Sequence, residues 1–202
     1  MIVEDGKFYF IKDEFFDVFK EYGLMINKEN GNKRPCYFCF KDRQDNEIIW
    51  FVPISIRYEK YKKIYDAKKI KNGKKPVYNF VFGNVLGKKA VFLIQNIFPT
   101  TLDYIEKKYT NSNKDVEIPE VVKDEVITKS LRVVNLAKSG VQIPFYDIIE
   151  MKKILLKGWA NFNLFQRWSR FFIYIYIERN NYGFVCVKQC VLLAYYIWKW
   201  CE

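Results

Sequence analysis

The sequence predicts an α+β domain in which a small antiparallel sheet, or partly open β-barrel, is flanked by helices. Short apolar runs bounded by turn residues, such as 36–40, 47–52 and 77–83, predict strands. Two longer segments, the basic 57–70 and the amphipathic 119–138, predict helices. With 202 residues the chain is long enough for one domain with a hydrophobic core, or for one domain plus an appendage.

The first elements begin with an alternating apolar run at 7–11, which predicts a strand. Asp13 then offers an N-cap for a short helix, and Gly23 offers its C-terminal stop. The runs 36–40 and 47–52 are joined by a charged turn, so they predict a hairpin.

The later elements are predicted in the same way. The runs 77–83 and 89–96 predict a second hairpin. A capping-box-like pattern at 100–103 predicts a short helix that ends near residue 109. Residues 141–149 predict a last strand, which a proline interrupts.

The end of the first hairpin is the first candidate site. Pro53 has no backbone donor, so it is expected to end the strand or to lie at its edge. Ser55 and Arg57 follow at a strand-to-helix junction, where a hydroxyl and a guanidinium could face one ligand. Strand pairing should bring the other end of the hairpin, Lys33 and Arg34, close to this junction.

Positive charge is concentrated directly after this junction. Nine Lys/Arg lie between Arg57 and Lys75 against Glu59 and Asp66, a net charge of +7 out of +11 for the whole chain. Such a field indicates a polyanion partner, with RNA or DNA as the first candidates. The residues expected to contact RNA are Arg34, Tyr58, Lys60, Lys62, Lys63, Lys68 and Lys69.

The basic segment has simpler interpretations as well. It could be only a solubilising helix face, with Glu59 paired to Lys63. Tyr58, Tyr61 and Tyr65 interleave with the lysines, which suits single-stranded RNA because rings stack on bases and charges bind phosphates. The same three tyrosines are spaced i, i+3 and i+7, so they could instead dock the helix on the sheet.

The composition excludes several kinds of chemistry. The chain has no histidine, which excludes His-based nucleophile activation and His metal ligands. Cys36 and Cys39 could form a zinc site with Cys186 and Cys190, but alternation on a strand should place Cys36 and Cys39 on opposite faces. No metal and no cofactor are therefore expected. Odd, unpaired cysteines, no signal peptide and no apolar run of membrane-spanning length predict a cytoplasmic protein.

The C-terminal segment has a different composition. Residues 156–202 are dense in aromatic side chains and hold every tryptophan except Trp50. We therefore predict a domain at 1–155 and an extension at 156–202. The extension could be genuine or the product of a disrupted reading frame, and an alternative hypothesis is that it binds a membrane surface.

Three stretches carry a family resemblance. They are Lys-Arg-Pro-Cys-Tyr at 33–37, Val-Pro-Ile-Ser-Ile-Arg-Tyr-Glu-Lys-Tyr-Lys at 52–62, and the stretch at 83–99 that ends in Leu-Ile-Gln-Asn-Ile-Phe-Pro. A looser match lies at 140–144. In this order and spacing the chain, over about residues 7–154, resembles the RNase toxins of type III toxin–antitoxin systems, the ToxN/AbiQ/CptN family, and most closely the CptN branch.

The resemblance implies a partly open β-barrel with helices, distantly like MazF-type toxins, and a metal-independent endoribonuclease. It also implies two RNA partners, an mRNA substrate and a repeated pseudoknot antitoxin that inhibits the toxin, is processed by it and assembles with it into closed rings. No DNA or membrane partner is implied. Ser55 matches the family's active-site hydroxyl stretch, Arg57 lies near its basic residue, and Lys33 matches the basic residue before the first hairpin strand. Ile56 stands where the family often has a second hydroxyl.

An RNase without histidine is chemically reasonable, because RNA carries its own nucleophile, the 2′-OH. Arg57 and Lys33 would stabilise the phosphorane-like state, and Ser55 would hydrogen-bond the 2′-OH or a non-bridging oxygen. The expected products are a 2′,3′-cyclic phosphate and a 5′-OH. A guanidinium binds phosphate well but accepts protons poorly, so slow cleavage is expected. The alternative is a non-catalytic RNA-binding protein whose site is disabled by Ile56.

Overall fold

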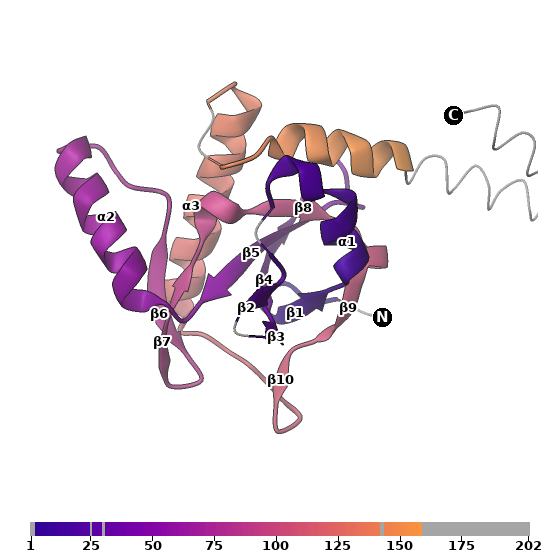
Figure 1. Ribbon diagram of the computed structural model, residues 1–202, viewed down its shortest axis with the longest axis horizontal. Helices are drawn as coiled ribbons and strands as arrows, with labels where there is room; N and C mark the ends of the chain where they lie inside the picture. The colour runs from indigo at the N-terminus through magenta and orange to yellow at the C-terminus, as the bar shows by residue number, and fades with distance from the viewer. Residues whose placement is uncertain (1–2, 25, 30, 142–143, 159–202) are drawn as a thin grey trace, which may run out of the picture. The chain divides into compact units, whose positions relative to one another are not determined.

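The structure is a computed structural model that describes residues 3–24, 26–29, 31–141 and 144–158. Its main feature is an antiparallel sheet of seven strands that does not close into a barrel (Figure 1). Strand order is β6-β7-β5-β4-β1-β9, and β8 pairs with β5 as well. The strands are β1 (Phe8–Ile11), β4 (Cys36–Lys41), β5 (Ile49–Ser55), β6 (Val81–Val85), β7 (Lys88–Phe92), β8 (Phe98–Thr100) and β9 (Ile105–Lys108).

Helices flank this sheet, so the predicted α+β class is confirmed. The described helices are α1 (Asp13–Val18), α2 (Tyr58–Asn72), α3 (Glu120–Lys138) and a helix over 148–158. Single 3-10 turns are η1 (Lys20–Tyr22), η2 (Ile94–Asn96) and η3 (Leu102–Tyr104). Two small ribbons are formed by β2 (Lys28–Glu29) with β3 (Asn32–Lys33) and by β10 (Thr110–Asn111) with β11 (Lys114–Asp115). None of the described helices is long and apolar enough to cross a membrane.

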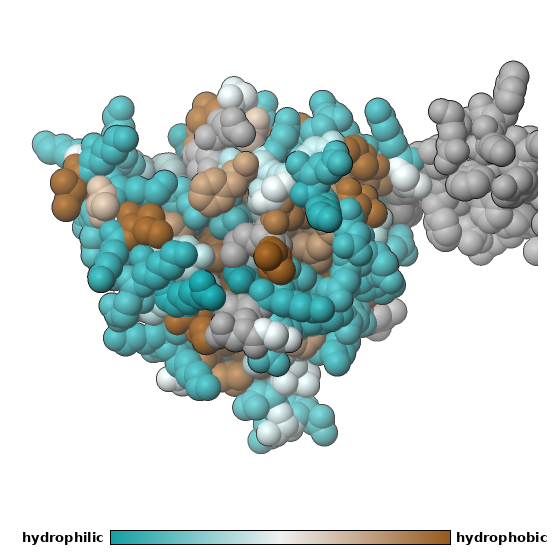
Figure 2. All heavy atoms as spheres, viewed as in Figure 1, coloured by the Kyte–Doolittle hydropathy of each residue, from teal (hydrophilic) through white to brown (hydrophobic). Residues whose placement is uncertain are grey.

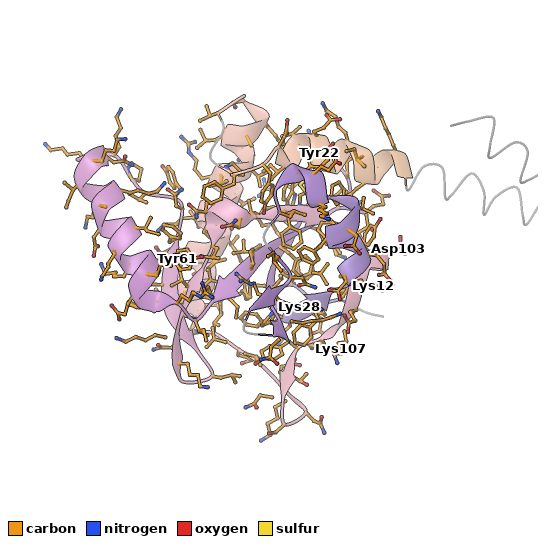
Figure 3. The ribbon with its side chains drawn as sticks, viewed as in Figure 1. Lys12, Tyr22, Lys28, Tyr61, Asp103 and Lys107 are labelled. Atoms are coloured by element: carbon orange, nitrogen blue, oxygen red, sulfur yellow. The ribbon has the colours of Figure 1, made fainter. Side chains whose placement is uncertain are left out.

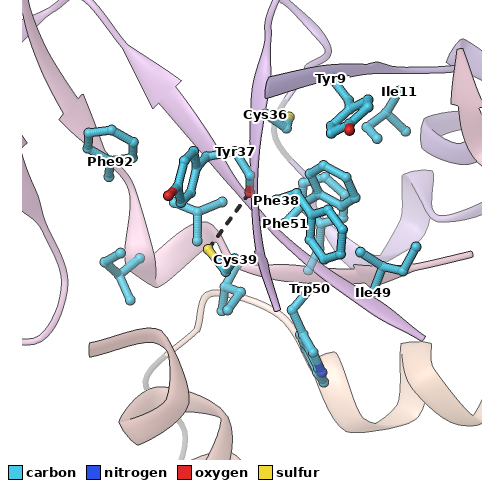
Figure 4. Close-up of a cluster of buried hydrophobic side chains, with 14 of the residues drawn as sticks. Tyr9, Ile11, Cys36, Tyr37, Phe38, Cys39, Ile49, Trp50, Phe51 and Phe92 are labelled. Carbon is cyan, nitrogen blue, oxygen red and sulfur yellow. Dashed lines mark hydrogen bonds between the residues drawn. The ribbon is translucent and has the colours of Figure 1, made fainter. Parts of the chain in front are cut away.

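The core is built mainly from aromatic rings on β1, β4 and β5 (Figure 4). Phe38 and Phe51 are cross-strand partners whose rings stack at 5.4 Å, and Phe51 stacks in turn on Phe98 at 6.2 Å. On the same hairpin, Tyr37 meets Phe92 edge to face at 5.5 Å. Because such pairs add to the free energy gained from burial, the predicted β4–β5 hairpin becomes the centre of the domain.

Strand β5 does not end at Pro53, in contrast to the prediction. It continues to Ser55 and lies inside the sheet, between β4 on one side and β8 and β7 on the other. The carbonyl of Pro53 accepts from the backbone N–H of Leu93 at 3.0 Å, at the point where β7 passes through η2 into β8. In a strand, the backbone N and O of one residue point to the same side. The side of Pro53 that lacks an N–H therefore faces the segment between β7 and β8, where a regular ladder hydrogen bond is not needed.

The β6–β7 hairpin lies between two layers. Its Val81, Val85 and Phe92 belong to the main core, whereas Phe80 and Val91 form a second small core under α2. The tyrosines predicted to dock α2 do so, because all three pack on this second core. Their ring partners are Phe82 for Tyr58 and Tyr65, at 5.1 and 5.3 Å, and Phe80 for Tyr61, at 5.4 Å.

Two predicted elements are wrong. The helix expected after Thr100 is absent from the described residues, because Thr100 is a buried β8 residue that pairs with Ile49, and the chain then forms η3 and the edge strand β9. The strand expected at 141–149 is not formed by residues 144–149, because 144–147 are an irregular segment and helix 148–158 then begins. The Asp147 carboxylate begins that helix by accepting from the backbone N–H groups of Ile149 and Glu150, at 3.0 and 2.9 Å.

Helix 148–158 belongs to the described domain. Met151 and Leu155 are buried in the main core, and Leu156 packs against it. A chain shortened for study should therefore keep this helix and end after residue 158. The predicted extension lies outside the described residues from 159 onward, so its role stays a prediction.

Candidate functional site

The predicted junction lies where the central strand β5 passes into α2. Ser55 is the last residue of β5, pairs with Val91 of β7 and is only 1% exposed. Its Oγ accepts a hydrogen bond from the backbone N–H of Arg57 at 3.2 Å. This short side-chain-to-backbone bond turns the chain from strand to helix, and it joins the Ser55 side chain to the backbone of Arg57.

The two residues after Ser55 face outward. Ile56 is 61% exposed, so it is not a core residue. Arg57 is also exposed and takes the N-cap position of α2, with φ −76° and ψ 54°. The junction thus presents a branched apolar side chain and a guanidinium side by side at the surface.

Lys33 is held by carboxylates. Its ammonium forms ion pairs with Glu106 of β9 and, at 3.5 Å, with Asp13 of α1. The hydrogen bond with Glu106 is the main reason why the pKa of Lys33 is raised. Strand β9 lies three places from β5 in the sheet, so these contacts direct the Lys33 side chain away from the central strand. A lysine whose charge is already offset twice is a weaker phosphate ligand than sequence position alone indicated.

Arg34 lies in the interior beside the junction. It is 9% exposed, and its backbone N–H donates to the carbonyl of Asn27 at 2.7 Å. With Pro53, Asn96 and Tyr146 it lines a cavity of about 10 Å³, which has room for about one water molecule. Arg34 therefore forms part of the wall of this cavity and, like Ser55, it is mostly buried.

The other predicted RNA-binding lysines lie around α2 and do not share one face. With about 3.6 residues per turn, Lys60 and Lys63 point away from the docked tyrosines, while Lys62, Lys68 and Lys69 flank them. Lys62 pairs with Asp66 at 2.6 Å, and among the described residues this replaces the expected Glu59–Lys63 pair. Figure 2 shows hydrophilic side chains covering α2 with isolated apolar ones between them. Two isoleucines of this helix, Ile64 and Ile70, are exposed.

The tyrosines of α2 are engaged in packing. Tyr61 lies on the side of α2 that faces the hairpin (Figure 3), against Phe80. The ring of Tyr58 rests on Phe82, and the Nζ of Lys89 lies 5.1 Å from its centre. Stacking of bases on these rings would require them to leave their positions on the second core.

Lys88 and Lys89 were missed by reasoning from the sequence. The signal was available, because both follow a tight turn on the strand that was expected to pair after the basic helix. With them, residues 57–92 hold eleven Lys/Arg against two acidic residues, a net charge of +9 out of +11. The segment 57–92, which contains α2 and the β6–β7 hairpin and which we call the basic unit, therefore carries most of the net charge.

The cysteines of the described domain are not suited to chemistry. Cys36 and Cys39 are both buried, and burial raises the pKa of each thiol to about 12. Both are therefore protonated at neutral pH, whereas a nucleophile or metal ligand must be a thiolate. Across the described ranges, no three Cys, Asp or Glu side chains are placed to hold one metal ion.

Comparison with known proteins places the fold. No protein-family model matches the sequence, and no curated protein matches it significantly. Among solved structures, AbiQ, a lactococcal anti-phage endoribonuclease of a type III toxin–antitoxin system, is similar with a TM-score of 0.56 and 14% identity, over 76% of this chain and 98% of that chain.

Two further structures are similar over nearly their whole length. One comes from a type III toxin–antitoxin system in which a non-coding RNA pseudoknot selectively inhibits the toxin, with a TM-score of 0.52 and 15% identity over 77% of this chain and 98% of the other. One comes from a bacterial antiviral system regulated by a processed non-coding RNA, with a TM-score of 0.53 and 13% identity over 73% and 95%. The chain therefore has the fold of the ToxN/AbiQ proteins of type III toxin–antitoxin systems, as its motifs predicted.

Proposed function

We propose that the protein is a cytoplasmic endoribonuclease toxin that cleaves RNA at the Ser55–Arg57 junction. The observation that supports this most is the hydrogen-bonded Ser55–Arg57 turn, which lies on the central strand of this fold and at the start of the basic unit. The regulator would be a repeated RNA pseudoknot that the enzyme processes and with which it forms a closed ring, and the toxic substrate would be mRNA.

The proposed reaction needs little from the protein beyond positioning and charge. The 2′-oxygen of the RNA bonds to the adjacent phosphorus while the P–O5′ bond breaks, which leaves a 2′,3′-cyclic phosphate and a 5′-OH. The proton of the 2′-OH passes to solvent, and the leaving O5′ takes one up. Arg57 offers a planar guanidinium to two phosphate oxygens as charge develops on them. Because the chain has no histidine and a guanidinium accepts protons poorly, turnover is slow.

Lys33 has a supporting part in this proposal. It holds α1 and β9 together through Asp13 and Glu106, beside the first strand of the hairpin that carries the site. Its field adds to that of Arg57 only partially, because two carboxylates offset it. The main electrostatic role therefore belongs to Arg57.

A cleavage assay on single-stranded RNA tests the proposal. The purified wild-type protein should cleave RNA at the same rate with and without EDTA, and it should leave a 2′,3′-cyclic phosphate. Loss of activity on chelation, or a product with a 5′-phosphate, would contradict this mechanism.

The alternative function is RNA binding without turnover, and Ile56 is the residue that favours it. It is an exposed apolar side chain between Ser55 and Arg57, where a phosphate oxygen would approach. Leaving such an oxygen without a polar partner costs about 1–3 kcal/mol. A site of this kind would bind RNA but stabilise the transition state poorly.

Replacing Ile56 with serine distinguishes the two functions. We expect Ile56→Ser to raise the single-turnover cleavage rate about tenfold or more while RNA affinity stays unchanged, because about 1.4 kcal/mol corresponds to a factor of ten. Ile70→Ser is the matched control, since Ile70 is exposed on α2 away from the junction. Equal rates for the wild type and both variants would show that residue 56 does not face the scissile phosphate.

A further inference from the structure

We infer that the outer end of the β6–β7 hairpin is a phosphate-binding surface for single-stranded RNA, with Lys89 as its main contact. This surface consists of Asn84 and Lys89, and it would hold the strand that passes the Ser55–Arg57 junction. The inference rests on the proposed function, because it places the substrate of that same site.

The sheet register sets Lys89 next to the junction. Ser55 is the last residue of β5 and pairs with Val91, so Lys89 lies two residues beyond the last rung of the β5–β7 ladder, where the chain turns into α2. Side chains alternate along a strand, so Lys89 shares a face with Val91, the face turned toward α2. The Nζ of Lys89 accordingly lies 5.1 Å from the ring centre of Tyr58, the first residue of α2.

The hairpin extends beyond the helix that covers it. In Figure 1 the tip of β6–β7 continues past the first turn of α2. The face toward α2 is apolar at Phe82 and Val91, which are paired, and polar at the next pair on that face, Asn84 and Lys89. Both polar residues are exposed. The change from packing residues to polar residues marks the point where the covered surface ends and a free surface begins.

The hairpin is held rigidly, which favours binding. Its two-residue turn has Leu86 and Gly87 at φ 52° and 72°, the combination that matches the twist of paired strands. A Cβ at Gly83 would lie 2.9 Å from Val122 of α3, so the hairpin and α3 are in close contact. The Nζ of Lys129 also donates to the carbonyl of Phe80 at 3.0 Å. A cation on a fixed support loses less conformational entropy on binding than one on a mobile loop.

The charge of this surface is not offset. Within the described part of the chain, neither Lys88 nor Lys89 forms an ion pair with a carboxylate. Lys7 and Lys108, at the other end of the sheet, share Asp115 at 3.1 and 2.8 Å. A polyanion is therefore attracted to the basic unit in preference to the β1–β9 edge.

The chemistry at Lys89 suits phosphate and not bases. Lysine is a point charge with three donors and no acceptor, so it binds phosphate oxygens without reading sequence. The Tyr58 ring beneath it is engaged with Phe82 and is not presented for stacking. Lys89 should therefore contribute to affinity for every RNA sequence and to the salt dependence of binding.

Salt-dependent RNA binding tests the inference. Binding of a fluorescent single-stranded RNA oligonucleotide is measured by anisotropy at several salt concentrations for the wild type, Lys89→Ala, Lys89→Gln and the control Lys114→Ala. Lys114 is exposed on the β10–β11 ribbon. We expect both Lys89 variants to lose about 0.7 of the slope of log K against log salt, as one lost phosphate contact does. The loss should be equal for two unrelated RNA sequences, Lys89→Arg should restore the slope, and Lys114→Ala should leave it unchanged.

The outcomes separate this inference from the proposed function. Suppose that the wild type binds RNA with a steep slope, that the Lys89 variants match it, and that Lys60→Ala or Lys63→Ala lowers the slope. This result overturns the hairpin surface and leaves the proposed function standing. A wild type that does not bind RNA overturns both. A loss limited to one RNA sequence contradicts the assignment of Lys89 to phosphate.

Discussion

Replacing Lys152 with methionine should lower the free energy of unfolding by about 3–5 kcal/mol. Lys152 lies on helix 148–158 with its side chain 8% exposed, and its Nζ lies 2.9 Å from Asp42, which is 2% exposed, and 2.6 Å from Asp45. The Asp42 carboxylate also accepts from the Trp50 indole at 3.0 Å and from the backbone N–H of Gln44 at 3.0 Å. Without Lys152 the nearest remaining cation to this buried carboxylate would be the Nζ of Lys138, at 3.8 Å and on a side chain that is 35% exposed.

The neighbouring lysine supplies a matched control. Lys153 pairs with Glu150 at 3.0 Å, but its side chain is 61% exposed, so Lys153→Met should change stability by less than about 1 kcal/mol. Urea unfolding at neutral pH measures both variants. Adding Asp42→Asn to Lys152→Met should recover part of the loss, because it removes a buried charge that has lost its closest partner. Equal, small effects at 152 and 153 would show that the network does not anchor this helix.

The same network gives stability a pH dependence. Burial by itself would raise the pKa of Asp42, but hydrogen bonds from Lys152, Gln44 and Trp50 outweigh it and lower the pKa. A carboxyl whose pKa is lowered by folding stabilises the native state above its unfolded pKa, and this contribution is lost as pH falls through the folded value. The wild type should therefore lose stability in acid, and Asp42→Asn should lose less over the same range.

Replacing Arg57 with alanine should lower single-turnover cleavage by about 10²–10³-fold, as does loss of one group that stabilises developing charge. Arg57→Lys should recover only part of this rate, since an ammonium cannot contact two phosphate oxygens in the fork geometry of a guanidinium. Ser55→Ala should lower cleavage by about 10²-fold and keep the fold, because the turn loses the hydrogen bond from the Arg57 backbone N–H, which costs about 1 kcal/mol.

Arg43 serves as the control for this series. It is exposed on the turn at the opposite end of the β4–β5 hairpin, so Arg43→Ala removes the same charge far from the junction. Its cleavage rate should match that of the wild type. Cleavage by Arg57→Ala at the wild-type rate would move the active site away from this junction.

Strong local patterns in the sequence predicted most of the fold. The hairpin β4–β5, the helices α2 and α3 and the tyrosine stripe follow from hydrophobic periodicity and turn residues. The helix expected after Thr100 failed because a capping pattern is local, whereas pairing of β8 with β5 depends on the whole sheet. The place of Pro53 inside β5 likewise depends on the whole sheet, because β5 passes there from one partner strand, β8, to the next, β7.

The candidate site was predictable only in part. Ser55 and Arg57 are two residues apart, so their contact follows from one turn. Lys33 takes one of its partners from a strand 73 residues away, and no local pattern shows that Glu106 would be there. Lys89 reaches Tyr58 through the pairing of β7 with β5. Contacts between residues so far apart in the sequence depend on which strands pair, and local sequence patterns do not show this.

The most direct test of the proposed activity compares two RNA oligonucleotides that differ only at the cleaved position, one with a 2′-OH and one with a 2′-O-methyl group. The wild-type protein should bind both, cleave only the first and leave a 2′,3′-cyclic phosphate, as seen by mass spectrometry of the fragments. Cleavage of the 2′-O-methyl oligonucleotide at the same bond would contradict attack by the 2′-OH, and with it the mechanism assigned to Ser55 and Arg57.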